Sequence, residues 1–209
     1  MRLIDTHSHL FLEEFSEDLP QVIERARSAG VTHIFMPNID STTIDSMLSV
    51  CNTYNDYCFP MIGLHPTSVN ADYEKELEIV ARELRSFNKY IAIGEVGMDL
   101  YWDKTFLKEQ QIVLDKQINW ALEYDLPVVI HCRDAFGYIY NVLEPYKNTS
   151  LKGVFHSFTG TDDEAARILE FSGFLIGING VVTFKKSRLP EVLTKIPLEK
   201  IVLETDSPY

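Results

Sequence analysis

Residues 126–158 read LPVVIHCRDAFGYIYNVLEPYKNTSLKGVFHSF and decide the fold class. Two short runs rich in β-branched residues, Pro127–His131 and Lys152–His156, predict strands, and the amphipathic stretch between them predicts a helix that ends near Tyr146. A strand, a helix and a second strand in this order are typical of a βαβ unit with parallel strands. Each of the two predicted strands ends in a histidine, so the same unit also indicates a functional site.

The same alternation continues in both directions from this unit. Further strands are predicted at Leu3–Asp5, Val31–Met36, Phe59–Leu64, Tyr90–Gly94, Phe174–Ile178 and Ile201–Glu204. Helices are predicted from Leu19 to a stop at Gly30, from a cap at Ser41 or Thr42 to about Tyr54, near Asp72–Phe87, over Thr105–Tyr124, near Asp162–Phe171 and after Lys186. Eight strands alternating with helices predict a closed (β/α)8 TIM barrel, and a doubly wound open sheet is the alternative.

The number of predicted helices is one short of a full barrel. The chain stops at Tyr209, directly after the eighth predicted strand. We therefore expect residues 1–209 to form a single α/β TIM-barrel domain that lacks the final C-terminal helix.

Composition restricts the classes of protein. Hydrophobic residues make up 45% of the 209 residues, so a sizeable core can be buried. No apolar run approaches the roughly 18 residues that a transmembrane helix needs, and no signal peptide is recognisable, so we expect no membrane contact. The three scattered cysteines are typical of reduced thiols and predict a cytoplasmic protein. The net charge of −12 argues against a wide basic surface for nucleic acid, so a polyanionic substrate would need local positive charge such as divalent ions.

Five of the six histidines lie at or just after the carboxyl end of a predicted strand, where barrel enzymes build their active sites. These are His7, His9, His65, His131 and His156, and the carboxylates at the same end are Glu95, Glu204 and Asp206. His7 and His9 are two residues apart on an extended segment, which puts both imidazoles on one face. Such a gathering predicts a site for divalent metal ions that activates water for hydrolysis. His33 would lie at the opposite end of the barrel, in a structural role.

Six segments in chain order identify a family. They are 4–9 (IDTHSH), 63–66 (GLHP), 93–99 (IGEVGMD), 126–135 (LPVVIHCRDA), 156–160 (HSFTG) and 203–209 (LETDSPY). With these segments the chain resembles the TatD-like metal-dependent deoxyribonucleases of the amidohydrolase-like barrel superfamily. The resemblance runs along essentially the whole chain, and the combination is far more specific than any one segment.

The resemblance implies a ligand set and an activity. One metal ion would be bound by His7, His9, Glu95 and Asp206, and a second by Glu95, His131 and His156. Glu95 would bridge the two ions, and Glu204 would be an additional metal ligand or stand just behind the ligands. Members of the family cleave DNA, commonly as 3′→5′ exonucleases, with Mg²⁺, Mn²⁺ or Zn²⁺. We accordingly expect single-stranded DNA or DNA 3′ ends as a transiently bound substrate, and no obligate protein partner.

Two metal ions can clamp a phosphodiester and lower the pKa of a bound water. In that chemistry the expected catalytic residues are Asp206, which would take a proton from the water, and Glu95. Four residues are expected to contact the substrate: His65, Arg133, Tyr101 and Trp102. Arg133 follows His131 by two residues and can bind phosphate through two parallel hydrogen bonds, and His65 can donate to a phosphate oxygen. Tyr101 and Trp102 can stack on a base.

Three alternatives remain at the level of sequence. An amidohydrolase of the dihydroorotase or phosphotriesterase kind would bridge its metals with a carboxylated lysine at the fourth strand, whereas this chain has Glu95 there and Lys89 before the strand. A D-aminoacyl-tRNA deacylase could use the same metal site. An inactive metal-binding barrel would follow if the missing C-terminal segment were needed for activity.

Overall fold

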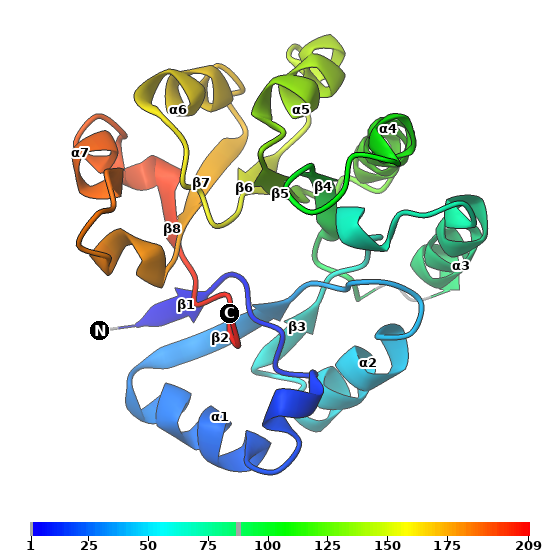
Figure 1. Cartoon of the computed structure of the whole chain (residues 1–209). Helices are drawn as coiled ribbons and strands as arrows, with labels where there is room; N and C mark the ends of the chain where they lie inside the picture. Colours follow the sequence, from blue (N-terminus) through cyan, green and yellow to red (C-terminus); the bar gives the residue numbers. More distant parts are fainter. Residues whose placement is uncertain (1, 87–88) are drawn as a thin grey trace.

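Parallel strands form the wall of a barrel with helices outside it (Figure 1). The structure is a computed structural model and describes residues 2–86 and 89–209. The strands of this part of the chain are β1 Leu3–Asp5, β2 Val31–Met36, β3 Cys58–Pro60, β4 Ile93–Asp99, β5 Val128–Arg133, β6 Gly153–Phe155, β7 Phe174–Ile178 and β8 Ile201–Leu203. All the paired neighbours run parallel, in the order of the chain.

The barrel is closed by two single bridges between its sheets. Strands β1 to β3 form one sheet and β4 to β8 form the other. Ile62, just after β3, pairs with Ile93 at the start of β4, and Ser8, after β1, pairs with Ser207, after β8. The amide of Thr6 also donates to the carbonyl of Leu203 over 3.1 Å. The structure therefore confirms the predicted α/β barrel rather than an open sheet.

Helices alternate with the strands and bury one face each against them. They are α1 Leu19–Ser28, α2 Ile44–Thr53, α3 Tyr73–Ser86, α4 Leu107–Glu123, α5 Phe136–Leu143, α6 Asp162–Leu169 and α7 Leu189–Leu193. Single 3₁₀ turns lie at Glu13–Phe15, Pro66–Ser68, Glu144–Tyr146, Gly180–Thr183 and Leu198–Lys200. The buried face of α4 includes Val113, Leu114 and Ile118. None of the helices described has the length and apolar character to span a bilayer.

Two predicted strands lie at the wrong positions. The third was expected over Phe59–Leu64 but is only Cys58–Pro60, and the fourth was expected to end at Gly94 but runs over Ile93–Asp99. Glycines usually weaken strands, which hides β4 in the sequence. In the fold Gly97 is required there: its φ is +134°, and a Cβ would lie 2.0 Å from the carbonyl oxygen of His131. Glu95 is therefore inside a fully buried strand rather than after one.

One predicted helix cap differs from the structure. Helix α2 begins after Thr43, because the side chain of Thr42 bonds to Asp40 and that of Ser41 to Glu76 instead of capping the helix. The predicted end of the third helix at Phe87 lies outside the described residues. Within the described residues no helix follows β8, and residues 204–209 run back over the segment after β1 (Figure 1).

Candidate metal centre

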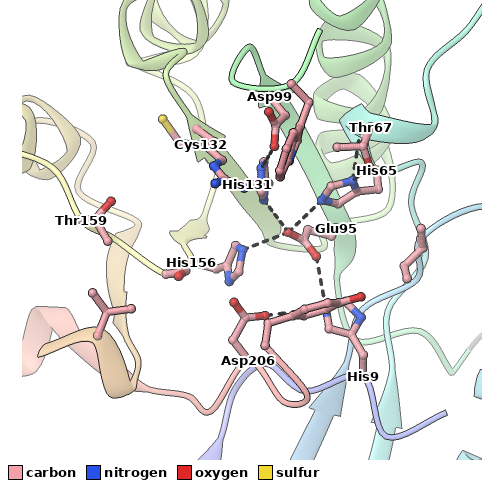
Figure 2. Close-up of a pocket in the computed structure, with 16 residues that line it drawn as sticks. His9, His65, Thr67, Glu95, Asp99, His131, Cys132, His156, Thr159 and Asp206 are labelled. Atoms are coloured by element: carbon pink, nitrogen blue, oxygen red, sulfur yellow. Dashed lines mark hydrogen bonds and ion pairs between the residues drawn. The ribbon is translucent and has the colours of Figure 1, made fainter. Parts of the chain in front are cut away.

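The carboxyl ends of the strands surround a cavity of about 630 Å³. His9, Glu95, His131, His156 and Asp206 all line it (Figure 2). They come from the segment after β1, from β4 and β5, and from the segments after β6 and β8, so residues from nearly the whole length of the chain meet at one mouth. Glu95 and His131 lie inside β4 and β5, and the other three follow a parallel strand, as the sequence predicts.

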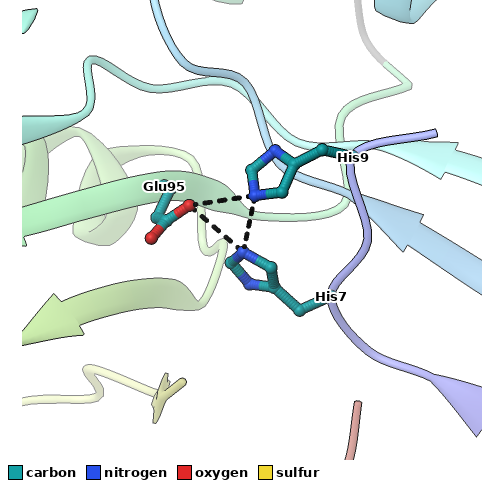
Figure 3. A group of neighbouring side chains, drawn as sticks. All are labelled: His7, His9 and Glu95. Atoms are coloured by element: carbon teal, nitrogen blue, oxygen red, sulfur yellow. Dashed lines mark hydrogen bonds and ion pairs between the residues drawn. The ribbon is translucent and has the colours of Figure 1, made fainter. Parts of the chain in front are cut away.

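Glu95 lies at the centre of this group, and its two carboxylate oxygens face two different sets of nitrogens. Oε2 is 3.1 Å from Nε2 of His7 and 3.5 Å from Nε2 of His9 (Figure 3). Oε1 is 3.0 Å from Nδ1 of His131 and 2.9 Å from Nε2 of His156. A carboxylate between two separate groups of nitrogen ligands is arranged as a bridge between two cations.

Asp206 completes the first group. Its Oδ1 lies 3.7 Å from Nε2 of His7 and 3.8 Å from Nε2 of His9. The amide of Asp206 donates to the carbonyl of His7, and the amide of His9 donates to the carbonyl of Ser207 over 2.8 Å. The backbone of the first metal-binding segment therefore holds Asp206 in place.

Asp5 supports the same turn and was not singled out in the sequence. Its buried carboxylate accepts hydrogen bonds from the amide of Thr205 over 2.9 Å and from the Thr205 hydroxyl over 2.6 Å. The amide of His7 donates to the same carboxylate over 3.3 Å. Asp5 therefore joins the segments that carry His7 and Asp206 across the closing seam of the barrel. In the sequence, the sign of this role is that Asp5 is an acid two residues before the pair His7 and His9.

The outer nitrogens of the second pair of histidines face two further carboxylates. Oδ2 of Asp99, at the end of β4, lies 2.9 Å from Nε2 of His131. Oε1 of Glu204 lies 3.6 Å from Nδ1 of His156 and accepts a hydrogen bond from the amide of Ser157. The structure thus places Glu204 behind His156, on the side of the ring away from Glu95. Asp99 was not predicted as a site residue, although it belongs to the quoted segment 93–99.

Burial and charge give His9 and Glu95 the protonation states that can bind metal. Burial lowers the pKa of His9 to about 3, so this ring is neutral and offers a lone pair. Burial raises the pKa of the Glu95 carboxyl, but its electrostatic interactions with the imidazoles of His156, His65 and His7 outweigh burial and hold this pKa well below its usual range. Glu95 is therefore an anion in the centre of the site.

His65 stands beside the second group, and the backbone of its own loop binds its Nδ1. Its Nε2 lies 3.3 Å from Oε1 of Glu95. Its Nδ1 accepts a hydrogen bond from the amide of Thr67 over 3.2 Å, which leaves the ring proton of the neutral imidazole on Nε2. Burial lowers the pKa of His65, which favours this neutral form. His65 therefore presents an N–H donor to the cavity, as its predicted role toward phosphate requires.

Arg133, Tyr101 and Trp102 form a cluster at the rim. The Arg133 guanidinium carbon lies 3.9 Å from the centre of the Tyr101 ring and 5.2 Å from that of Trp102. Arg133 and Trp102 line the cavity, and the side chain of Trp102 is 73% exposed. The predicted substrate residues thus lie together, with Tyr101 beneath the arginine rather than in the lining. His33 has no part in this site: it contacts Thr32 and stacks on Phe59 in the first sheet.

The donor set fits divalent metal ions. Three groups of ligand atoms each lie within 4.8 Å of one another: His7, His9 and Glu95; His7, His156 and Asp206; and His65, Glu95 and His131. Neutral imidazoles mixed with carboxylates are ligands that zinc and related ions prefer. The fold and these donors together define a class of protein, the barrel hydrolases that work with bound metal ions.

Comparison with known proteins defines the family within this class. A model of the family described as "TatD related DNase" matches residues 4–209, and the chain belongs to this family. The uncharacterized metal-dependent hydrolase YabD of Bacillus subtilis is 36% identical over 99% of this chain and 80% of that protein. A 3′-5′ ssDNA/RNA exonuclease TatD of Pantoea ananatis is 32% identical, with the same coverage of the two chains. The crystal structure of YjjV, a TatD homologue from Escherichia coli, superposes with a TM-score of 0.91 at 33% identity, over 99% of this chain and 80% of that one.

Proposed function

We propose that the chain is a two-metal phosphodiesterase that removes nucleotides from the 3′ end of single-stranded nucleic acid. The observation that carries the proposal is the position of Glu95, whose two oxygens face two separate groups of nitrogens. The name of the Pantoea ananatis relative, a 3′-5′ ssDNA/RNA exonuclease, supports the substrate and the direction of digestion.

The residues around Glu95 divide into two candidate ligand sets. The first consists of His7, His9, Asp206 and Oε2 of Glu95, and the second consists of His131, His156 and Oε1 of Glu95. Four imidazoles against two carboxylates favour Zn²⁺ or Mn²⁺ over Mg²⁺, which prefers oxygen ligands. Glu204 stands behind His156 and orients this ring in the proposal.

The chemistry of hydrolysis divides among the residues that line the cavity. When bound, two divalent ions supply positive charge for the phosphodiester and lower the pKa of an attacking water. Asp206 is the proton acceptor in the proposal, because its side chain is 16% exposed at the cavity and borders both of the first two histidines. His65 donates a hydrogen bond from its Nε2–H to a nonbridging phosphate oxygen. The Thr67 contact supports this role because it keeps the ring proton on Nε2.

The rim supplies recognition of an unpaired base. A base can stack on the exposed face of Trp102 only if its own pairing and stacking partners are absent, which favours a single strand. Arg133 places a positive charge beside this indole, so that a base and the phosphate attached to it are bound together. The net charge of −12 makes such local donors necessary, because the surface as a whole repels a polyanion.

The test uses the whole chain, loaded with Mn²⁺ or Zn²⁺, on a single-stranded oligonucleotide labelled at either end. Digestion from the 3′ end releases a 3′ label at once as a mononucleotide, whereas a 5′ label appears in a ladder of shortening products. Glu95→Ala removes the bridging carboxylate and is expected to abolish both patterns, and His33→Ala is the matched control that retains them. If the metal-loaded protein leaves both labelled strands intact, the proposal is wrong.

A further inference from the structure

We infer that Asp99 is a positioning residue that selects which nitrogen of His131 faces the second metal site. The inference rests on the proposed two-metal function, because it concerns the second of the two ligand sets. The contact of Asp99 with that set is to the imidazole of His131, so Asp99 would act through this ring.

The ring of His131 is held between two carboxylates. Its Nδ1 lies 3.0 Å from Oε1 of Glu95, and its Nε2 lies 2.9 Å from Oδ2 of Asp99. The side chain of Asp99 is only 2% exposed, so water does not compete for the contact. A carboxylate only accepts hydrogen bonds, so the contact with Asp99 keeps a proton on Nε2, and the nitrogen that would offer its lone pair to a cation beside Glu95 is Nδ1.

The ring of His131 is turned the opposite way from those of the other site histidines. His7, His9, His65 and His156 all point Nε2 at Glu95, whereas His131 points Nδ1 at it. A ring in the reversed orientation needs a partner on its far side, and Asp99 is that partner. An outer carboxylate of this kind fixes the tautomer of a ligating histidine and makes the ligand more basic.

Asp99 is itself held in place by its neighbours. The amide of Asp99 donates to Oε1 of Gln110 on α4 over 2.9 Å, and Nε2 of Gln110 donates to the carbonyl of Asp99 over 3.2 Å. Oδ1 accepts a hydrogen bond from the amide of Tyr101 over 3.0 Å, which leaves Oδ2 for His131. Each carboxylate oxygen thus has its own donor, and the side chain cannot turn without losing both contacts.

The two oxygens make Asp99→Asn an informative variant. Asparagine preserves the size of the side chain but has only one acceptor oxygen. It therefore cannot accept hydrogen bonds from both the Tyr101 amide and the His131 ring. Asp99→Ala removes both acceptors. Asp103→Asn is the matched control, because Asp103 lies in the same loop, loses the same charge and bonds to the exposed Thr105 instead of a site histidine.

The experiment titrates metal-free protein with Zn²⁺ in a calorimeter. The parent and Asp103→Asn should each bind two ions, and the affinity of each site should be the same in the two proteins. In Asp99→Asn and Asp99→Ala the second ion should bind about 10–100-fold more weakly, the usual cost of losing such a partner, while the first ion is unchanged. A histidine ¹⁵N spectrum of the zinc-loaded parent should show the His131 proton on Nε2, protected from exchange with water, and this protection should disappear in Asp99→Ala.

The outcomes separate this inference from the function on which it rests. If the parent itself binds only one ion, the two-metal proposal fails. If the parent binds two ions and Asp99→Asn, melting at the parent temperature, binds both as tightly as the parent, the role of Asp99 is refuted. An equal loss at both sites would also refute it, because the contact reaches the ring of His131 in the second ligand set.

Discussion

Replacement of Arg133 by alanine tests how an acidic protein recognises a phosphate. The guanidinium stacks 3.9 Å from the centre of the Tyr101 ring, which keeps its long side chain extended along the rim of the cavity. Arg133 also lines the cavity together with His65, so both residues border the space that a phosphate would enter. Arg133→Ala removes the positive charge of the rim cluster while it leaves every candidate metal ligand in place.

The expected magnitude follows from the exposure of the side chain. A donor in a water-excluded site is worth roughly 2.7–4 kcal/mol, about 10²–10³-fold in turnover. Arg133 is exposed, so its contact with phosphate should lie toward the low end for a charged hydrogen bond, about 1.5–2 kcal/mol. At about 1.36 kcal/mol for each factor of ten, kcat/KM should fall about 10–30-fold. Arg133→Lys should recover only part of this loss, because an ammonium group neither stacks flat on the ring nor binds phosphate bidentately.

The assay measures kcat/KM on a single-stranded oligonucleotide and the zinc content of each variant. Arg85→Ala, at the last turn of α3 on the opposite end of the barrel, is the matched control for the loss of one positive charge. Zinc content should be the same in all variants. If zinc-loaded Arg133→Ala digests the oligonucleotide at the parent rate, the arginine only packs on its aromatic neighbours and the phosphate is bound elsewhere.

Three other changes test the fold around the site. Asp5→Asn leaves one acceptor oxygen for the two donors of Thr205, so it should lower the free energy of unfolding in urea by about 1.5–3 kcal/mol. It should also weaken the binding of the first metal ion, and unchanged values for both would argue against the seam contact. His33→Ala should leave zinc content and turnover at parent values, and a folded variant without zinc would mean that the control residue is misplaced. Zn²⁺ at a hundredfold excess over its dissociation constant should stabilise the protein against urea by about 2.7 kcal/mol for each ion that binds the folded state. EDTA should remove this increase, and it would be absent if no ion binds the folded state.

The sequence predicts the barrel because its signal is local and repeated. Short apolar runs such as Val31–Met36 and Phe174–Ile178 match the strands at both ends. Strand β4 is the larger of the two exceptions, since Gly94 and Gly97 make it resemble a loop. The glycines are required by the close approach of β5, a tertiary contact that no local pattern contains.

The inner donors of the site are predictable for a related reason. Parallel strands place their carboxyl ends at one rim, so the positions of His131 and His156 at the ends of their predicted strands are enough to predict that they meet. The outer carboxylates are not predictable in this way. Asp5 acts on Thr205, 200 residues away, and Asp99 acts on His131, 32 residues away, and either acid could equally have been an exposed loop residue. Only the closed barrel shows which acid faces which partner.

The outer carboxylates give the cavity a charge that bears on the order of binding. Asp5, Glu95, Asp99 and Glu204 are buried around one mouth, and Asp206 borders it. A phosphate that enters this mouth without cations meets carboxylates at close range, where little water screens their repulsion. The same carboxylates would attract divalent ions, and the charge of bound ions would reverse the sign of the local potential. In the proposed function, metal binding therefore has to precede the binding of a phosphate at this mouth.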